Sequence, residues 1–376
     1  MLPFIDLKHQ YGLIKDDVQK RIDRVLESGR FILGGEVTEL QERLAEYAGS
    51  KHCICCSSGT DALLMALMAL EIGPGDAVVT TPFTFFATVE TIMLVGATPV
   101  FADIDPATYD IDPKKVEEAI ERTEKEGRLK VKAIAPVDLF GLCADYDALL
   151  PIAEKHGLAV IQDACQAFGA VAPSGKKAPS IGTIGCTSFF PAKPLGCYGD
   201  GGAVFTDDDD LFAKLDSILV HGRAANDKYD NARLGLNARC DTIQAAILLS
   251  KLEIFPGEVE LRQKVAARYR ANLEGVVSLQ KIPEGNLSVY AQFCPRSPKF
   301  AEIQAALKAQ DVPTARYYPI PMHLLGATKS LGGKVGDMPN AEAAASDIFA
   351  LPMHPYLDDA TIDRICETIA ATVKNA

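Results

Sequence analysis

One lysine lies in a loop that offers a charged side chain few polar partners. Lys193 sits within SFFPAKPLGCYGDGG, where prolines, glycines and aromatic residues dominate, and it is the only charge between Lys177 and Asp200. An exposed loop lysine is the ordinary interpretation. An amine held among apolar groups, however, has a lowered pKa and is a free nucleophile. The surroundings of Lys193 therefore indicate Schiff-base chemistry, by which proteins hold pyridoxal phosphate (PLP).

A second candidate feature is a helix start that follows an apolar strand. The strand is predicted at 53–56, and Ser58-Gly59-Thr60-Asp61 opens a nearly all-apolar helix at 61–70. The free amides and the dipole of a helix N-terminus form an anion-binding site, which suits the phosphate of PLP. An ordinary helix cap is the alternative interpretation of the same residues.

Two further side chains follow predicted strands and suit a flat, protonated ring. Asp163 ends the apolar run VIQD and is either a helix cap or the anion that keeps the PLP pyridine nitrogen protonated. Gln166 follows one turn later, where it can contact the ring hydroxyl. Phe85, in FTFF, is placed to stack on the ring, and a core position is its alternative.

The elements that must position these residues alternate between strand and helix. Such alternation predicts a mostly parallel sheet covered on both faces, with ligands bound outside the carboxyl ends of the strands. Residues 1–11 are expected to be extended. The predicted strands are 53–56, 77–81, 98–102, 131–136, 159–162, 186–190 and 202–205, and the predicted helices of this part include 61–70, 87–94, 112–121, 147–156 and 211–219.

The pattern changes after two helices predicted at 241–255 and 259–273. A smaller α+β unit follows, so we predict a large PLP-binding domain of residues 1–255 and a small C-terminal domain of residues 256–376. The elements expected in the small unit are a strand at 288–294 and helices at 300–310, 340–349 and 359–373.

Composition excludes several classes of protein. The chain of 376 residues has a net charge of -12, which argues against nonspecific binding to nucleic acid or to an anionic membrane. It has neither GxGxxG after its first strand nor a Walker motif, which disfavours NAD and ATP. Its ten cysteines show no disulfide spacing and only weak zinc-site spacing, so reduced thiols are expected. We find no signal peptide or membrane span and expect a cytoplasmic protein.

These motifs together resemble the DegT-type family of fold-type I PLP-dependent aminotransferases that act on nucleotide-linked keto sugars. The resemblance runs from FIDLKHQY to LPMHPYLD and is most specific in SSGTDAL, QDACQAFGA, SFFPAKPLGCYGDGG and GLNARCDTIQAAIL. It is strongest to the subgroup that aminates position 3 of UDP-2-acetamido-2-deoxy-3-oxo-D-glucuronate in bacterial lipopolysaccharide O-antigen synthesis. The implied reaction is a ping-pong transfer with L-glutamate as donor.

The resemblance also implies roles for individual residues. Lys193 would hold PLP and carry the proton, and the active site would be shared within a homodimer. The other implied contacts are Asp163 with the pyridine nitrogen, Gln166 with the phenolic oxygen, Gly59, Thr60 and Ser188 with the phosphate, Asn237 with the phosphate from the other subunit, and Arg239 and Tyr318 with the sugar. The candidates for cationic side chains that bind UDP and the uronate are Arg239, Arg233, Lys228 and Arg316.

The sequence departs from the family pattern at three positions. Gln162 stands where an acid is usual, Ala192 replaces a common serine, and Tyr317 occupies the place of a histidine on the substrate side. The last difference leaves open an aminotransferase for another keto sugar, such as a 4-keto-6-deoxy sugar. A non-catalytic PLP-binding regulator is a further alternative, disfavoured because the chain has no basic helix-turn-helix segment.

Overall fold

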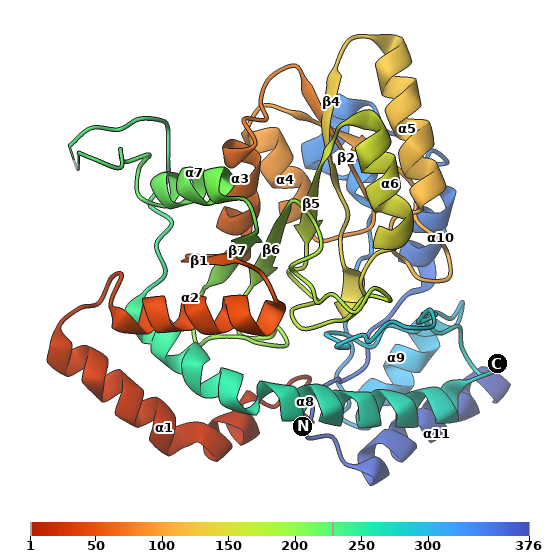
Figure 1. Cartoon of the computed structure of the whole chain (residues 1–376). Coiled ribbons are helices and arrows are strands. Elements are labelled where there is room, and N and C mark those ends of the chain that lie inside the picture. The colour runs from red at the N-terminus through yellow and green to blue at the C-terminus, as the bar shows by residue number, and fades with distance from the viewer. Residues whose placement is uncertain (1, 228, 376) are drawn as a thin grey trace.

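The computed structural model describes residues 2–227 and 229–375, within which one sheet of seven strands forms the centre (Figure 1). The strand order is β1-β7-β6-β5-β4-β2-β3. β7 runs antiparallel to both of its neighbours, and the other pairings are parallel. The strands are β1 (His52–Cys56), β2 (Asp76–Thr80), β3 (Thr98–Phe101), β4 (Lys130–Ala135), β5 (Ala159–Asp163), β6 (Ile184–Ser188) and β7 (Gly202–Thr206).

Helices bury both faces of the sheet, and successive residues of a strand point to opposite faces. Val79 contributes to the hydrophobic core on one face and its neighbour Val78 to the core on the other. The first face is covered by α2 (Gly35–Ala48), α5 (Pro113–Glu126), α6 (Tyr146–His156) and α8 (Thr242–Leu273), and the second by α3 (Gly59–Ala69), α4 (Ala87–Leu94) and α7 (Asp209–Leu219). The α/β class predicted from the alternation is therefore confirmed.

This topology gathers several chain segments at one edge of the sheet. β1, β6, β5, β4 and β2 all run in one direction, so their carboxyl ends meet there. Because β7 runs the opposite way, its amino end at Gly202 reaches the same edge, beside the turn that leads into α3. A Cβ atom on Gly202 would lie 2.4 Å from the Ser58 carbonyl oxygen, so this close approach requires glycine.

A separate hydrophobic core lies between the C-terminal part and the last turns of α8. Tyr269 and Leu273 of α8 pack there with α9 (Phe300–Lys308) and α11 (Asp359–Asn375). α10 (Pro339–Asp347) instead packs against Phe83 and Phe140, which lie outside the C-terminal part. The two helices predicted at 241–255 and 259–273 form one helix that contains Pro256. The boundary between residues 255 and 256 stays a prediction, and it falls inside α8.

Two local predictions are wrong. Residues 288–294 form no strand, because their backbone bonds to a turn: the Val289 N–H donates to the Gly141 carbonyl in the 3-10 helix η1 (Leu139–Gly141), 2.9 Å away. Residues 1–11 are not extended throughout, because α1 (Leu7–Ser28) starts early. The Asp6 carboxylate caps this helix and accepts a hydrogen bond from the His9 N–H at 2.9 Å.

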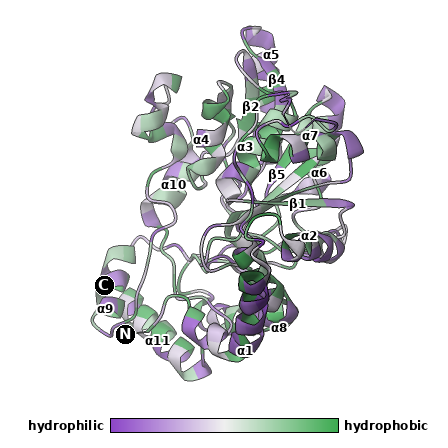
Figure 2. Cartoon of the chain, turned by 90° about the vertical axis from the view of Figure 1, so that its left-hand side faces the viewer, coloured by the Kyte–Doolittle hydropathy of each residue, from purple (hydrophilic) through white to green (hydrophobic). Residues whose placement is uncertain are grey.

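Hydropathy follows the same layering. Figure 2 shows hydrophobic ribbon in β5 and α3 at the middle of the molecule and hydrophilic ribbon on α1 and the far turns of α5. Among the described residues, no helix combines the length and the apolar character needed to cross a bilayer.

Candidate active site

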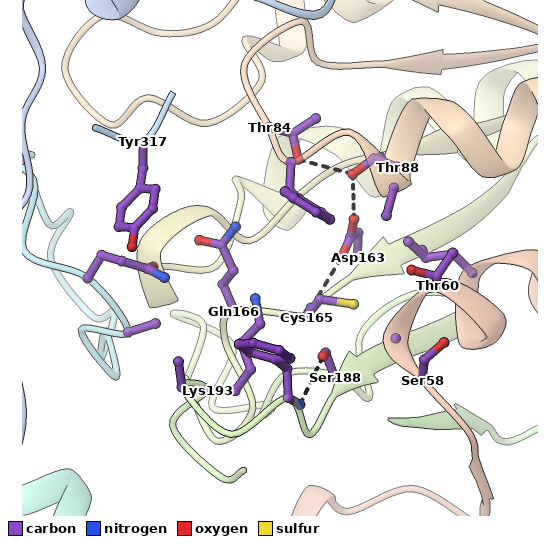
Figure 3. Close-up of a pocket in the computed structure, with 18 of the residues that line it drawn as sticks. Ser58, Thr60, Thr84, Thr88, Asp163, Cys165, Gln166, Ser188, Lys193 and Tyr317 are labelled. Carbon is purple, nitrogen blue, oxygen red and sulfur yellow. Dashed lines mark hydrogen bonds between the residues drawn. The ribbon is translucent and has the colours of Figure 1, made fainter. Parts of the chain in front are cut away.

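A cavity of about 370 Å³ opens at the edge of the sheet where the strand ends meet (Figure 3). Its walls come from the start of α3, the loop after β2, the end of β5 and the loop after β6. Segments 4–5, 291–292 and 317–318 close the opposite side. The cavity therefore lies where the sequence predicted ligand binding, outside the carboxyl ends of parallel strands.

Asp163 occupies the floor of this cavity and is almost fully buried. Its Oδ2 accepts a hydrogen bond from the Thr88 hydroxyl at 2.7 Å, and its Oδ1 accepts one from the Cys165 N–H at 3.1 Å. The Thr88 hydroxyl in turn contacts that of Thr84 at 3.0 Å, so a short chain of hydroxyl groups leads from Thr84, just before α4, through Thr88 to the carboxylate (Figure 3). These donors fix the carboxylate where a positive ring nitrogen would be stabilised.

Lys193 reaches the same cavity from the loop between β6 and β7. Its side chain is only partly exposed, and burial lowers the pKa of the amine, although Cys165 and Asp163 act in the opposite direction. The turn at its base is tight: the Lys193 N–H donates to the Phe190 carbonyl at 2.8 Å, and a Cβ on Gly196 would lie 2.6 Å from that carbonyl oxygen. This turn fixes the backbone from which the Lys193 side chain enters the cavity.

The start of α3 forms another wall of the cavity. The Ser58 hydroxyl accepts a hydrogen bond from the Asp61 N–H at 3.0 Å, which leaves the earlier amides of the first turn without intrahelical partners. A Cβ on Gly59 would lie 2.6 Å from the Cβ of Ser188, so glycine lets this serine approach the helix end. Gly59, Thr60 and Ser188 all line the cavity, where small groups and free N–H donors suit a phosphate.

Gln166, Tyr318 and Phe85 form the opposite wall. The Gln166 side chain accepts a hydrogen bond from the Phe140 N–H at 3.0 Å and donates one to the Tyr318 hydroxyl at 3.1 Å. The Phe85 ring is 57% exposed, so it is no core residue, and its centroid lies 6.3 Å from that of Tyr318. An aromatic face is therefore available to a planar ligand.

The remaining predicted residues are not brought to this cavity. The Arg239 guanidinium donates to the Asn237 carboxamide oxygen at 2.9 and 2.6 Å, and neither residue lines the cavity. The Arg316 guanidinium bonds carbonyls at the end of α10, and Arg233 is exposed elsewhere. Lys228 lies outside the described residues. Among the described residues that line the cavity, Lys193 is the only one with a cationic side chain.

Sequence reasoning missed Thr88 and Gln292. Thr88 follows Thr84 at helical spacing in an otherwise apolar segment, a signal that could have pointed to a shared polar face. Gln292 lines the cavity, and its buried amide oxygen has no hydrogen-bond partner among the described residues. Phe4 and Tyr317 meet edge to face at 6.4 Å, so the chain start also borders the substrate side.

The unusual Gln162 is explained by a buried acid behind the site. Burial raises the pKa of Asp138 to about 7, although hydrogen bonds from Ala144, Gln162 and Tyr146 oppose the shift. The Gln162 amide donates to Asp138 Oδ2 at 2.7 Å, and its oxygen accepts a hydrogen bond from the Ile181 N–H at 2.9 Å. A glutamate here would place two carboxylates in contact, so a neutral amide suits this position.

An amine of lowered pKa, a fixed carboxylate, an aromatic face and an anion-binding helix end in one α/β cavity define a fold-type I PLP-dependent enzyme. Comparison gives the family. The DegT/DnrJ/EryC1/StrS aminotransferase family matches residues 13–370, and the chain belongs to it. The expectation of an aminotransferase of this family is thereby confirmed.

Individual relatives cover nearly the whole chain. A Pseudomonas aeruginosa UDP-2-acetamido-2-deoxy-3-oxo-D-glucuronate aminotransferase is 50% identical over 98% of this chain and 99% of its own. A Geobacillus stearothermophilus pleiotropic regulatory protein is 45% identical over 98% of each. A Brucella abortus aminotransferase of the same family superposes with a TM-score of 0.96 at 47% identity, covering 99% of both chains.

Solved relatives also bear on the cofactor. A Bacillus subtilis protein crystallised with pyridoxamine phosphate matches with a TM-score of 0.88 at 30% identity, covering 99% of this chain and 83% of its own. The family uses PLP, so the cofactor expected from the sequence is confirmed. The cavity fits that group, because a helix end that begins with glycine, a carboxylate and an amine lie around one space.

Thr88→Val should weaken PLP binding about 10- to 100-fold, because it removes a hydrogen bond to a charged group while keeping the side-chain shape. Cofactor titration followed by absorbance measures the affinity. Thr91→Val is the matched control, because this buried hydroxyl of the same helix bonds only carbonyls of its own turn. Equal PLP affinity in the Thr88 variant and the wild type would show that the contact with Asp163 is not used.

Gln162→Glu should lower the free energy of unfolding by about 2–4 kcal/mol at neutral pH, because it buries a second carboxylate against Asp138. Raised carboxyl pKa values favour the folded state at low pH, so the deficit should be small near pH 5 and grow toward pH 8. Urea denaturation across this range measures it. Gln41→Glu is the control, since that side chain accepts from the Cys55 N–H at 3.0 Å and a carboxylate can do the same. A deficit independent of pH would refute this explanation.

Proposed function

We propose that the enzyme transfers an amino group from L-glutamate to the 3-keto carbon of UDP-2-acetamido-2-deoxy-3-oxo-D-glucuronate. The observation that carries amino transfer is that the Lys193 amine and the Asp163 carboxylate face one cavity beside an anion-binding helix end. The sugar is inferred from the Pseudomonas aeruginosa relative, whose name states this substrate. The reaction would serve lipopolysaccharide O-antigen synthesis, and we expect it to take place in the cytoplasm.

When bound, PLP supplies an electrophilic carbonyl and an electron-accepting ring. In this proposal the Lys193 amine holds the cofactor and, once released by the donor, moves a proton between carbon atoms, which a lowered pKa favours. Asp163, kept in place by Thr88, holds the proton on the ring nitrogen. Phe85 covers the ring face, and Gln166 bonds the phenolic oxygen.

The phosphate would rest on the start of α3, held by Gly59, Thr60 and Ser188. Binding there uses N–H donors and the helix dipole, so it requires no cationic side chain from this chain. The sugar side would be formed by Tyr318 with Tyr317, Phe4 and Gln292, which line the same cavity. Their aromatic faces and single amide suit a pyranose ring better than a second phosphate.

The substrates carry several negative charges, whereas Lys193 is the only cationic side chain on the described cavity wall. We therefore propose a homodimer in which a second copy completes each site. Asn237 and Arg239 are the candidates. Both lie in the segment between α7 and α8, where they bond to each other, and Asn237 is exposed. Asn237 would reach the phosphate, and Arg239 the uronate or the UDP moiety.

Two other functions remain as alternatives. The same chemistry on a 4-keto-6-deoxy sugar is left open by the tyrosine at position 317, which lines the cavity. A PLP-binding regulator without catalysis agrees with the name of the Geobacillus stearothermophilus relative. Against it, Lys193 and Asp163 retain the arrangement that proton transfer needs.

The test is an amine-transfer assay with purified protein, PLP, L-glutamate and a panel of UDP- and dTDP-linked keto sugars. We expect 2-oxoglutarate to form with the 3-keto uronate at a kcat/KM at least about 100-fold above that with a 4-keto-6-deoxy sugar, because a well-paired polar substrate group is worth a few kcal/mol. Lys193→Ala should abolish both turnover and the borohydride-reducible yellow chromophore.

Each alternative has its own outcome in this assay. A preference for the 4-keto sugar replaces the proposed substrate and leaves the chemistry intact. A chromophore without transfer to any keto sugar would favour the regulator. Normal transfer by Lys193→Ala would refute the assignment of the amine.

A further inference from the structure

A second buried lysine lies outside the cavity and has no evident polar partner. Lys251, in α8, is 1% exposed, and its amine makes no hydrogen bond within the described part of the chain. Burial lowers the pKa of this amine to about 8, although Glu258 and Cys197 act in the opposite direction. A desolvated amine destabilises a fold unless something is gained in return, so its position calls for an explanation.

The amine of Lys251 rests on an aromatic ring of the loop that carries Lys193. Its Nζ lies 4.4 Å from the centroid of the Tyr198 ring, a cation–π geometry that gains strength when it is shielded from water. On another side the Tyr198 ring meets the edge of Tyr11 from α1, with centroids 6.0 Å apart. The ring is therefore held between two helices.

A second residue on the same face of α8 grips the adjoining backbone. Gln244 precedes Lys251 by two helical turns, so both side chains point the same way. The Gln244 amide oxygen accepts a hydrogen bond from the Tyr198 N–H at 2.9 Å. A Cβ on Gly199 would lie 2.9 Å from the Gln244 amide nitrogen, so the backbone of the loop packs directly against the end of this side chain.

The segment held by α8 is tied directly to the base of Lys193. Cys197 N–H donates to the Phe189 carbonyl at 2.8 Å, and the Cys197 thiol contacts the same carbonyl at 3.0 Å. Phe189 and Cys197 flank Lys193 on either side in the sequence. These bonds join the two sides of the loop at its base. We therefore expect a displacement of Tyr198 to move Lys193 as well.

We propose that Lys251 is a positioning residue for the Lys193 amine. Its charge on the Tyr198 ring, together with the hydrogen bond from Tyr198 to Gln244, clamps the loop to α8 and keeps Lys193 aimed into the cavity. This inference rests on the proposed function, in which Lys193 carries PLP. A role in packing alone is the competing explanation, and it predicts no effect on the loop or on the bound cofactor.

The test is hydrogen exchange of the peptide covering residues 189–201, together with a pH titration of the PLP chromophore in the holoenzyme. Lys251→Met keeps the length and apolar stem of the side chain and removes its charge. We expect about tenfold faster exchange in this peptide, the size of one desolvated cation–π contact, and a displaced chromophore pKa. Tyr198→Leu should reproduce both changes, and Tyr198→Phe, which keeps the ring, should show neither.

Lys177→Met is the matched control, since that amine lies 4.1 Å from the centroid of the Tyr47 ring, outside the loop. It should leave exchange and titration unchanged. Wild-type exchange and titration in both Lys251→Met and Tyr198→Leu would overturn the proposal, even with lowered thermal stability. If Lys251→Met does not fold, Tyr198→Leu decides alone.

The proposed function is judged separately from this clamp. The chromophore of the wild type and its loss in Lys193→Ala report whether Lys193 holds PLP, whatever the Lys251 variant does. Exchange of the 189–201 peptide can also be measured without PLP. A failure of the clamp therefore cannot be mistaken for a failure of the cofactor assignment.

Discussion

The constraint on which this structure depends is a partly buried amine held close to a fixed carboxylate. Burial lowers the pKa of Lys193, and the Asp163 carboxylate lies at the floor of the same cavity. A flexible segment of chain would not hold the Lys193 amine and the Asp163 carboxylate in these positions. The sheet solves this problem, because Asp163 ends β5 while Lys193 lies in the loop that leaves the adjacent β6 and returns as β7.

Close backbone approach is the second requirement, and glycine meets it at both sides of the site. Gly59 admits Ser188 to the end of α3, and Gly202 admits the β7 backbone beside Ser58. The site is thus a place where strand ends, a helix start and a loop pack with little space between them. On the far side of the loop, α8 adds Gln244 and Lys251, which connects the cavity to the helix that also enters the C-terminal core.

Much of this arrangement could be predicted from local patterns. The alternation of apolar strands and helices predicted the parallel sheet, and strand ends predicted where Asp163 and the α3 start would meet Lys193. Contacts distant in sequence could not be predicted, such as Thr88 with Asp163 or Gln162 with Asp138. Local signals also gave wrong predictions. The run at 288–294 was predicted to be a strand but bonds to a turn, and α8 continues past Pro256, where two helices were predicted. Asn237 and Arg239, which the resemblance placed in the site, do not line the cavity of this chain.

The most direct measurement of the central claim is to reduce the PLP-loaded protein with borohydride, digest it and map the modified residue by mass spectrometry. The account predicts one pyridoxyl adduct, on the Lys193 side chain within the peptide that spans β6 to β7. It also predicts that an excess of L-glutamate added before reduction removes the adduct. A stable adduct on another lysine, with Lys193 unmodified, would contradict it.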